Sequence, residues 1–285
     1  MDNTPTYTIQ LKEVETNNIG VAELMKFYAF AKQYTYCKVQ LNLSPVNTVD
    51  ANLSALILAI AHRLKQDNKV FVFLILADHM GIFFRNGLMA HLQGKGNANP
   101  YNDDRHSAIP LTTFSIDDDA DFCQYLRRDF FGHRGMEGLT STTKTNLSTH
   151  YEEIFTNVGL HANTTSPVYS CGQYFPDKNV LKFTLVDVGD GFLKKISVKT
   201  TGQVTTDKDA ILWAIRELNT TKDIATFGPG GTGLKELKRY CAENNGSLHI
   251  CSGSGYVNFL KDRNMEHTLP TAFKGSIVNL IFRNI

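Results

Sequence analysis

Three polar side chains are spaced so that one face of a helix would carry a carboxylate, an amide and an imidazole. They are Glu153, Asn157 and His161, at positions i, i+4 and i+8. A carboxylate can take up a proton, and an amide oxygen can bind a hard cation. The same spacing is also typical of a polar helix face turned to solvent, so the stripe alone does not define a site.

A second group of residues could hold a purine base. Residues 180–186 have the pattern of a buried strand, which ends in Asp187 and is followed by Gly189 and Gly191. The carboxylate can accept a hydrogen bond from an adenine amino group, and the glycines would let the base and sugar lie against the main chain. Taken alone, this pattern is also that of an ordinary turn.

A glycine-rich turn over residues 228–233 leads directly into a helix that carries cationic side chains. Amides at the start of such a helix can bind phosphate, and the helix dipole strengthens this interaction. The glycine spacing also fits the dinucleotide fingerprint, but Ser252 stands where an acid for the ribose should follow the next strand. Leu234 occupies the place of the Walker lysine, which argues against a P-loop.

The elements that must position these residues fall into two parts. Residues 7–130 alternate between apolar strands and amphipathic helices, which predicts an α/β domain with helices packed on a central sheet. The strands are expected at 7–14, 39–43, 70–76 and 109–114, and the helices at 21–34, 53–65, 82–92 and 122–130. Residues 132–148 are rich in Gly, Ser and Thr, as a linker would be. The rest of the chain predicts an α+β sandwich, with helices at 151–162, 210–218 and 234–244 and strands at 168–174, 180–186, 248–251 and 277–282.

The first helix of the second part is expected to begin at a capping box formed by Thr149 and Glu152. Glu152 would then have a structural role, and its neighbour Glu153 would remain free for chemistry.

In chain order, the three groups resemble the N, G1 and G2 boxes of the GHKL ATPase superfamily, which has the Bergerat fold. The resemblance covers about residues 149–282 and implies ATP and Mg²⁺ as ligands. It implies that Glu153 is the general base and that Asn157 contacts the metal. The nucleotide-binding positions that it implies are Asn157, Asp187, Gly189, Gly191, Gly231, Thr232, Gly233, Leu234 and, on the last strand, Ser276.

Two further residues are candidates for contacts with the nucleotide. His161 has a counterpart in some anti-sigma-factor kinases, although a histidine at a helix end can equally pair with the helix dipole. Lys222 lies in the region 192–227, which is expected to hold the ATP lid, and a solvated lysine is the alternative there.

The first part resembles the STAS domain, the fold of anti-sigma-factor antagonists, over about a hundred residues that include the strand at 39–43, Asp50 and the strand at 70–76. Antagonists carry a phosphorylatable Ser or Thr directly after the acid that opens the helix, whereas Ala51 follows Asp50 here. The predicted organisation is a STAS-like βαβα domain at 1–131, a linker at 132–148 and a Bergerat-fold ATP-binding domain at 149–285.

The two resemblances imply a Mg²⁺-dependent ATPase, or an ATP-driven conformational switch, that acts on a protein partner docked on the STAS-like domain. A serine/threonine kinase of the anti-sigma-factor type and a non-catalytic nucleotide-binding module are the alternatives. Hydrolysis is expected to be slow, because no transducer domain follows to supply a lysine to the phosphates. A homodimer is one assembly that the resemblance allows.

The amino-acid composition limits the kinds of binding partner and the cellular location that we expect for the protein. The chain has 29 Lys and Arg against 28 Asp and Glu, so no overall field attracts nucleic acid or an anionic membrane. The longest apolar stretches are about half of a membrane span, and the start of the chain shows no secretory signal. The five cysteines are scattered and form no CxxC pair, which argues against a disulfide framework and a structural zinc site. We therefore expect a cytoplasmic protein.

Overall fold

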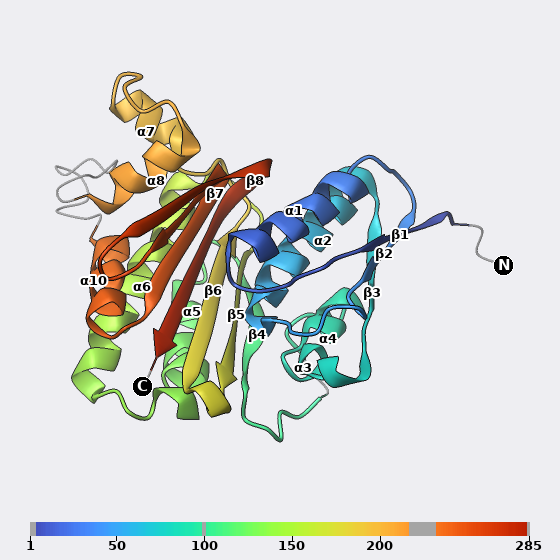
Figure 1. Cartoon of the computed structure of the whole chain (residues 1–285), viewed down its shortest axis with the longest axis horizontal. Coiled ribbons are helices and arrows are strands. Elements are labelled where there is room, and N and C mark those ends of the chain that lie inside the picture. Colours follow the sequence, from blue (N-terminus) through green and yellow to red (C-terminus); the bar gives the residue numbers. More distant parts are fainter. Residues whose placement is uncertain (1–3, 99–100, 217–231, 284–285) are drawn as a thin grey trace.

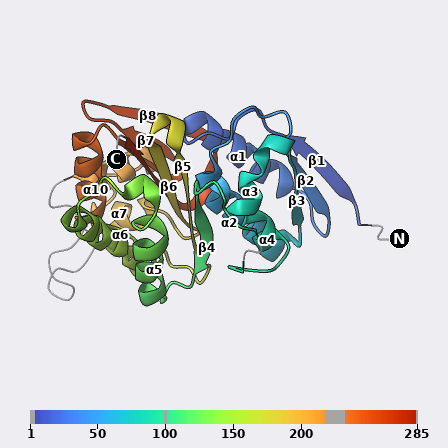
Figure 2. The same ribbon diagram turned by 90° about the horizontal axis from the view of Figure 1, so that it is seen from below.

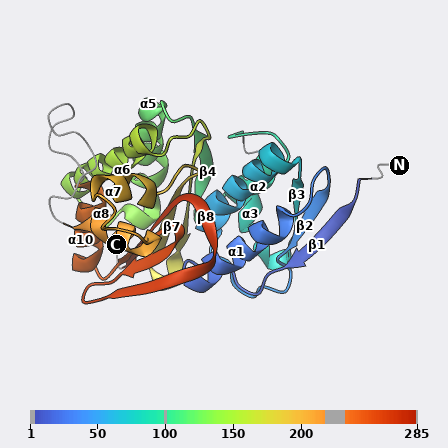
Figure 3. The same ribbon diagram turned by 90° about the horizontal axis from the view of Figure 1, so that it is seen from above.

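The structure, a computed structural model, describes residues 4–98, 101–216 and 232–283 and has four layers in which sheets and helices alternate (Figure 1). A three-stranded parallel sheet is followed by two helices, a five-stranded antiparallel sheet and a second set of helices. The same order is visible from below (Figure 2) and from above (Figure 3). The mixed α/β class expected from the sequence is confirmed. Within the described ranges, no helix combines the length and the apolar character that crossing a bilayer would require.

The first sheet contains β1 (Thr6–Gln10), β2 (Lys38–Asn42) and β3 (Phe71–Ile75), paired in this order. They are joined by α1 (Asn18–Ala31) and α2 (Ser54–Asn68). Parallel strands need such crossover helices, and the apolar residues of both helices pack against the sheet. The single helix expected at 82–92 is divided into α3 (Ile82–Arg85) and α4 (Leu88–Leu92), because Gly87 has a left-handed backbone with φ 92°.

The second sheet has the strand order β4-β5-β6-β8-β7. Its strands are β4 (Ala108–Phe114), β5 (Val168–Phe175), β6 (Val180–Asp187), β7 (Ser247–Phe259) and β8 (Asn264–Arg283). The helices of this half are α5 (Asp119–Tyr125), α6 (Ser141–His161), α7 (Leu193–Lys199), α8 (Asp207–Ile215) and α10 (Gly233–Glu243). The core between the sheet and α5 and α6 contains a group of aromatic side chains in mutual contact. Phe122 stacks on Phe155 with ring centroids 4.3 Å apart, and Phe130 stacks on Phe183 at 4.2 Å.

The strand expected at 109–114 exists, but it belongs to the other half of the molecule. β4 pairs antiparallel with β5 and forms one edge of the second sheet, whereas its place in the alternation of strands and helices predicted that it belongs to the first. The helix expected at 122–130 begins as α5 and continues as a π-helical segment, Leu126–Phe130, whose last residue lies in the core of the second sheet. Periodicity indicates that a segment is a strand, but not with which strand it pairs.

The capping box at Thr149 and Glu152 is not formed, and the predicted linker overlaps a helix. α6 begins at Ser141, where the Thr140 hydroxyl accepts a hydrogen bond from the N–H of Thr143 at 3.2 Å. Thr149 lies inside the helix and donates its hydroxyl to the carbonyl of Thr145, one turn earlier. The polar sequence continues as a helix because Leu147 and Tyr151 bury one side of it in the core.

A buried polar network joins the two halves at the start of α2. Lys182 on β6 donates to the carboxylate of Asp50 at 2.5 Å, and the Asn52 amide donates to the Thr184 hydroxyl at 2.7 Å. Ala51 is fully buried, and its N–H donates to the side chain of Gln173. The position directly after Asp50, where the STAS resemblance would place a phosphorylatable residue, is therefore occupied by an alanine and covered by the second sheet.

The Lys182–Asp50 pair offers a test of this interface. We expect Lys182→Met to lower the free energy of unfolding by about 3 kcal/mol, because it leaves the carboxylate of Asp50 buried without its cation. The matched control is Lys26→Met, which removes an exposed ion pair with Glu23 and should cost less than about 1 kcal/mol in chemical denaturation. Equal losses in the two variants would contradict a stabilising role for the buried pair.

Candidate functional site

Helix α6 lies against both of the other groups of predicted site residues. Near its middle, a Cβ built on Gly233 would lie 3.1 Å from Oε2 of Glu153, so the start of α10 is in close contact with this carboxylate. At its end, the carbonyl of Ala162 accepts a hydrogen bond of 2.8 Å from the N–H of Asp190, in the loop after β6. Glu153 and Ala162 are separated by a helical rise of about 14 Å. One helix therefore aligns segments that are far apart in the sequence.

Glu153 is half-buried, and Thr232 hydrogen-bonds to both of its carboxylate oxygens. The N–H of Thr232 donates to Oε1 at 3.1 Å, and the Thr232 hydroxyl donates to Oε2 at 3.2 Å. Thr232 is the residue before α10, so the carboxylate lies at the N-terminus of that helix. A negative charge is favoured there by the free amides and by the helix dipole. The same place would favour the charge of a phosphate.

Asn157 is one turn further along α6, and its Oδ1 atom is buried and has no hydrogen-bond partner among residues 4–98, 101–216 and 232–283. Buried amide oxygens are nearly always satisfied, so an orphaned one calls for an explanation. A hard cation bound to this oxygen would explain it. Mg²⁺ takes oxygen ligands, of which the protein commonly supplies one or two and phosphate groups and water molecules supply the rest. One oxygen donor is therefore present at the position where the resemblance implies a metal contact.

Asp187 is buried at the end of β6 and is only 6% exposed. Burial raises the pKa of its carboxyl group to about 6, and hydrogen bonds from Ser276 and Gly189 offset part of this shift. Ser276 is its register partner on β8, and the N–H of Gly189 donates to Oδ1 at 2.9 Å. The structure thus brings together Asp187 and Ser276, two residues expected at the base of the nucleotide.

The two glycines after Asp187 are required by packing. A Cβ on Gly189 would overlap the carbonyl oxygen of Ala162, at the end of α6. Gly191 has φ 72°, and a Cβ there would lie 2.6 Å from the Ser252 hydroxyl, which accepts a hydrogen bond from the N–H of Phe192. These glycines let the loop close on both the helix and the sheet, whether or not a nucleotide is bound.

Replacing Gly189 with alanine is expected to reduce stability by about 1–3 kcal/mol, because the methyl group would press on main-chain atoms that cannot rotate away. Thermal unfolding measures the effect. The control is Gly81→Ala, whose methyl group would approach only the flexible end of Arg85, at 3.2 Å. A Gly189→Ala protein that melts at the wild-type temperature would show that the loop does not close on α6 as described.

Some of the expected site residues are placed only in part. Gly231 and Lys222 lie outside the described residues. His161 is the last residue of α6, and only its backbone is described. Leu234 is partly buried and packs against the core of the second sheet, which is sufficient to explain an apolar residue there.

Two contacts of the site have no signal in the sequence. The hydrogen bonds from Thr232 to Glu153 and the close approach of Gly189 to Ala162 both join segments that only the fold brings together. Thr232 itself was an expected nucleotide contact, but its role as a partner of Glu153 was not foreseen.

No family model matches the sequence, and no curated protein resembles it at a significant level. Function therefore has to be inferred from the residues that α6 brings together.

Proposed function

We propose that the chain is a Mg²⁺-dependent ATP-binding protein that hydrolyses ATP, or uses it as a conformational switch, and acts on a protein partner. Its second half would be a Bergerat-fold domain of the GHKL type, and its first half a STAS-like domain. The observation that carries the proposal is the alignment along α6 of Glu153, the orphaned oxygen of Asn157 and the loop that follows Asp187.

In this proposal the adenine binds near the C-terminal end of α6, and the phosphates bind near the middle of α6, beside Glu153. Asp187, supported by Ser276, accepts a hydrogen bond from the adenine amino group. The amides at the start of α10, next to Thr232 and Gly233, receive the phosphates. When bound, Mg²⁺ would neutralise phosphate charge, and Asn157 is the residue that would hold it.

Glu153 acts in the proposal as the base that accepts a proton from the attacking group. Its two oxygens are hydrogen-bonded to Thr232 in the structure. A phosphate at the start of α10 would compete for the same N–H and leave the carboxylate free to accept the proton. Nucleotide binding would then activate the base through one exchange of hydrogen bonds.

A nucleotide-binding module without catalysis is the second candidate, and the contact between Glu153 and Thr232 favours it. A carboxylate at a helix N-terminus stabilises the helix, so Glu153 has a structural role at the start of α10 that does not depend on catalysis. The kinase alternative receives no such support, because the antagonist phosphorylation position is a buried alanine. A kinase would need an acceptor in another protein.

Turnover of ATP labelled at the γ-phosphate, with and without Mg²⁺, tests the proposal. Release of labelled inorganic phosphate that depends on Mg²⁺ is the expected result. Saturable ATP binding without release would select the nucleotide-binding module, and transfer of label to a protein would select the kinase. Absence of ATP binding by the folded chain would overturn the proposal.

A further inference from the structure

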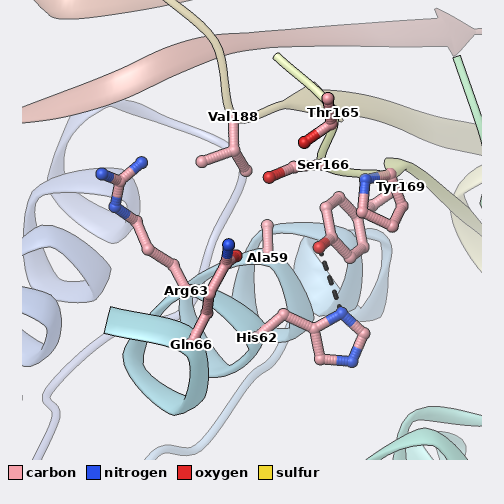
Figure 4. A pocket seen from close by; sticks show the side chains of 9 residues that line it. Ala59, His62, Arg63, Gln66, Thr165, Ser166, Tyr169 and Val188 are labelled. Carbon is pink, nitrogen blue, oxygen red and sulfur yellow. Dashed lines mark hydrogen bonds between the residues drawn. The ribbon is translucent and has the colours of Figure 1, made fainter. Parts of the chain in front are cut away.

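The two sheets pack on opposite sides of α2. On the side of the second sheet, the hydroxyl of Tyr169 is hydrogen-bonded to His62 at 3.1 Å, beside a cavity of about 200 Å³ (Figure 4). The charge of Arg63 at this cavity is balanced by Asp67, 3.2 Å away, so the cavity does not select a charged ligand. On the other side of α2, the outer face of the first sheet is not covered by any element of residues 4–98, 101–216 and 232–283 (Figures 1–3).

This uncovered face carries the apolar side chains of one edge strand. Alternation along β3 turns Phe71, Phe73 and Ile75 outwards, where they are 48%, 47% and 36% exposed. Val72 and Leu74 point to the opposite face and belong to the core around α2. Parallel sheets are normally covered on both faces, so an exposed apolar row predicts that a further element packs beside it.

The main chain of β3 is also free along its outer edge. The N–H of Phe71 donates to the carbonyl of Cys37, and in a parallel pair this direction repeats at every second residue. The main-chain groups of Val72 and Leu74 therefore point away from β2. No strand in the described part of the chain pairs with this edge, so these groups can bond to another strand.

A second edge strand shows how such pairing is prevented elsewhere in the molecule. β4, at the edge of the second sheet, contains Pro110 and shifts its register between Ile109 and Thr112. Prolines, bulges and charged side chains protect an edge from adding strands. β3 consists of five apolar residues, with no proline and no register shift. Its edge is therefore suited to pairing.

We propose that the strand that pairs with this edge is β3 of a second copy of the chain, antiparallel to the first, with a two-fold axis at Phe73. Phe73 then faces its own counterpart, and Phe71 faces Ile75 of the second copy, so the two apolar rows become one. The main-chain groups of Val72 bond to those of Leu74 in the second copy. Each contact occurs twice, as two-fold symmetry requires.

The charges at the two ends of β3 favour this occupant. Lys65 lies over the ring of Phe71, 5.8 Å from its centroid, and Lys69 is exposed just before the strand. Asp78 is exposed shortly after its end. An antiparallel second copy brings the basic end of one strand to the acidic end of the other, whereas a parallel one would bring lysines together. This complementarity selects a second copy in the antiparallel direction.

Sedimentation equilibrium of the full chain tests the proposal at about 100 µM, a concentration suited to a small interface. Twice the chain mass of 31.9 kDa is expected. Phe73→Lys and Phe73→Asp should each be monomeric, because the axis places two introduced like charges opposite each other. An equimolar mixture of the two variants should be more associated than either alone, because opposite charges then face each other across the axis.

The matched control is Val198→Lys, which changes an exposed apolar side chain on α7 and should remain dimeric. Circular dichroism establishes that each variant is folded. A wild type that stays monomeric, or a folded Phe73→Lys that remains dimeric, would overturn the proposal. Failure of the mixture to associate would contradict the two-fold register. These measurements use no nucleotide, so their outcome is independent of the proposed function.

Discussion

Replacing Glu153 with alanine is expected to lower the rate of ATP turnover about 10²–10⁴-fold, the usual contribution of a general base. Affinity for ATP should be equal to that of the wild type or higher. The change removes a negative charge from the start of α10 and frees the N–H of Thr232 for a phosphate oxygen. Turnover and equilibrium binding of the same variant, measured side by side, test both expectations.

Two further variants separate catalysis from structure. Glu153→Gln keeps the shape of the side chain and one acceptor for Thr232, so it should lose turnover without losing stability. Glu152→Ala removes the neighbouring carboxylate, which accepts a hydrogen bond from Ser148, and should retain turnover. Unchanged turnover in Glu153→Ala would remove this residue from the mechanism.

Replacing Asp187 with asparagine is expected to stabilise the nucleotide-free protein at neutral pH. Burial raises the pKa of this carboxyl group from 3.8 to about 6. The unfolded chain therefore ionises at lower pH than the folded one, and stability falls as pH rises from about 4 to about 6. At pH 7.5 the wild type has lost up to about 3 kcal/mol in this way, and a neutral asparagine avoids the loss.

The same variant should bind ATP about 10–150-fold more weakly, the equivalent of a hydrogen bond to a charged acceptor. Wild-type affinity for ATP should likewise fall as the pH drops below about 6, because the carboxyl group then carries a proton. Calorimetric titration and thermal unfolding at pH 7.5 measure the two effects. The control is Asp177→Asn, in an exposed turn before β6, which should change neither. Lower stability together with normal binding would identify Asp187 as a structural residue.

The sequence was sufficient to predict most of the elements but not how they pair. β2 and β3 lie within one residue of the predicted strands, because their apolar residues stand in short runs between turn signals. β4 was recognised as a strand and assigned to the wrong sheet, since its choice of β5 depends on contacts that no local pattern encodes. The start of α6 was predicted ten residues late, because the polar sequence before Thr149 has little helical periodicity and becomes helical through burial of Leu147 and Tyr151.

The candidate site was predictable as a set of residues but not as a set of contacts. The resemblance implied that Asp187 and Ser276 both lie at the adenine base, and the structure pairs them in register on β6 and β8. That Glu153 hydrogen-bonds to Thr232 follows from the packing of α6 against α10 and has no sequence signal. The buried oxygen of Asn157, which has no partner in the described part of the chain, has no sequence signal either. The glycines near Asp187 were attributed to ligand approach, and the close contacts with Ala162 and Ser252 provide another reason for them.

β4 comes from the first half of the sequence but belongs to the second sheet, and this affects how the chain can fold while it is being synthesised. α2 leaves the ribosome long before β5 and β6, yet one side of this helix packs against those strands. α1 likewise waits for β8, at the opposite end of the chain. A fragment that stops at residue 131 would expose these surfaces and β4 together, so we expect it to aggregate. We therefore expect the two halves, although they differ in sequence pattern, to unfold in a single cooperative transition.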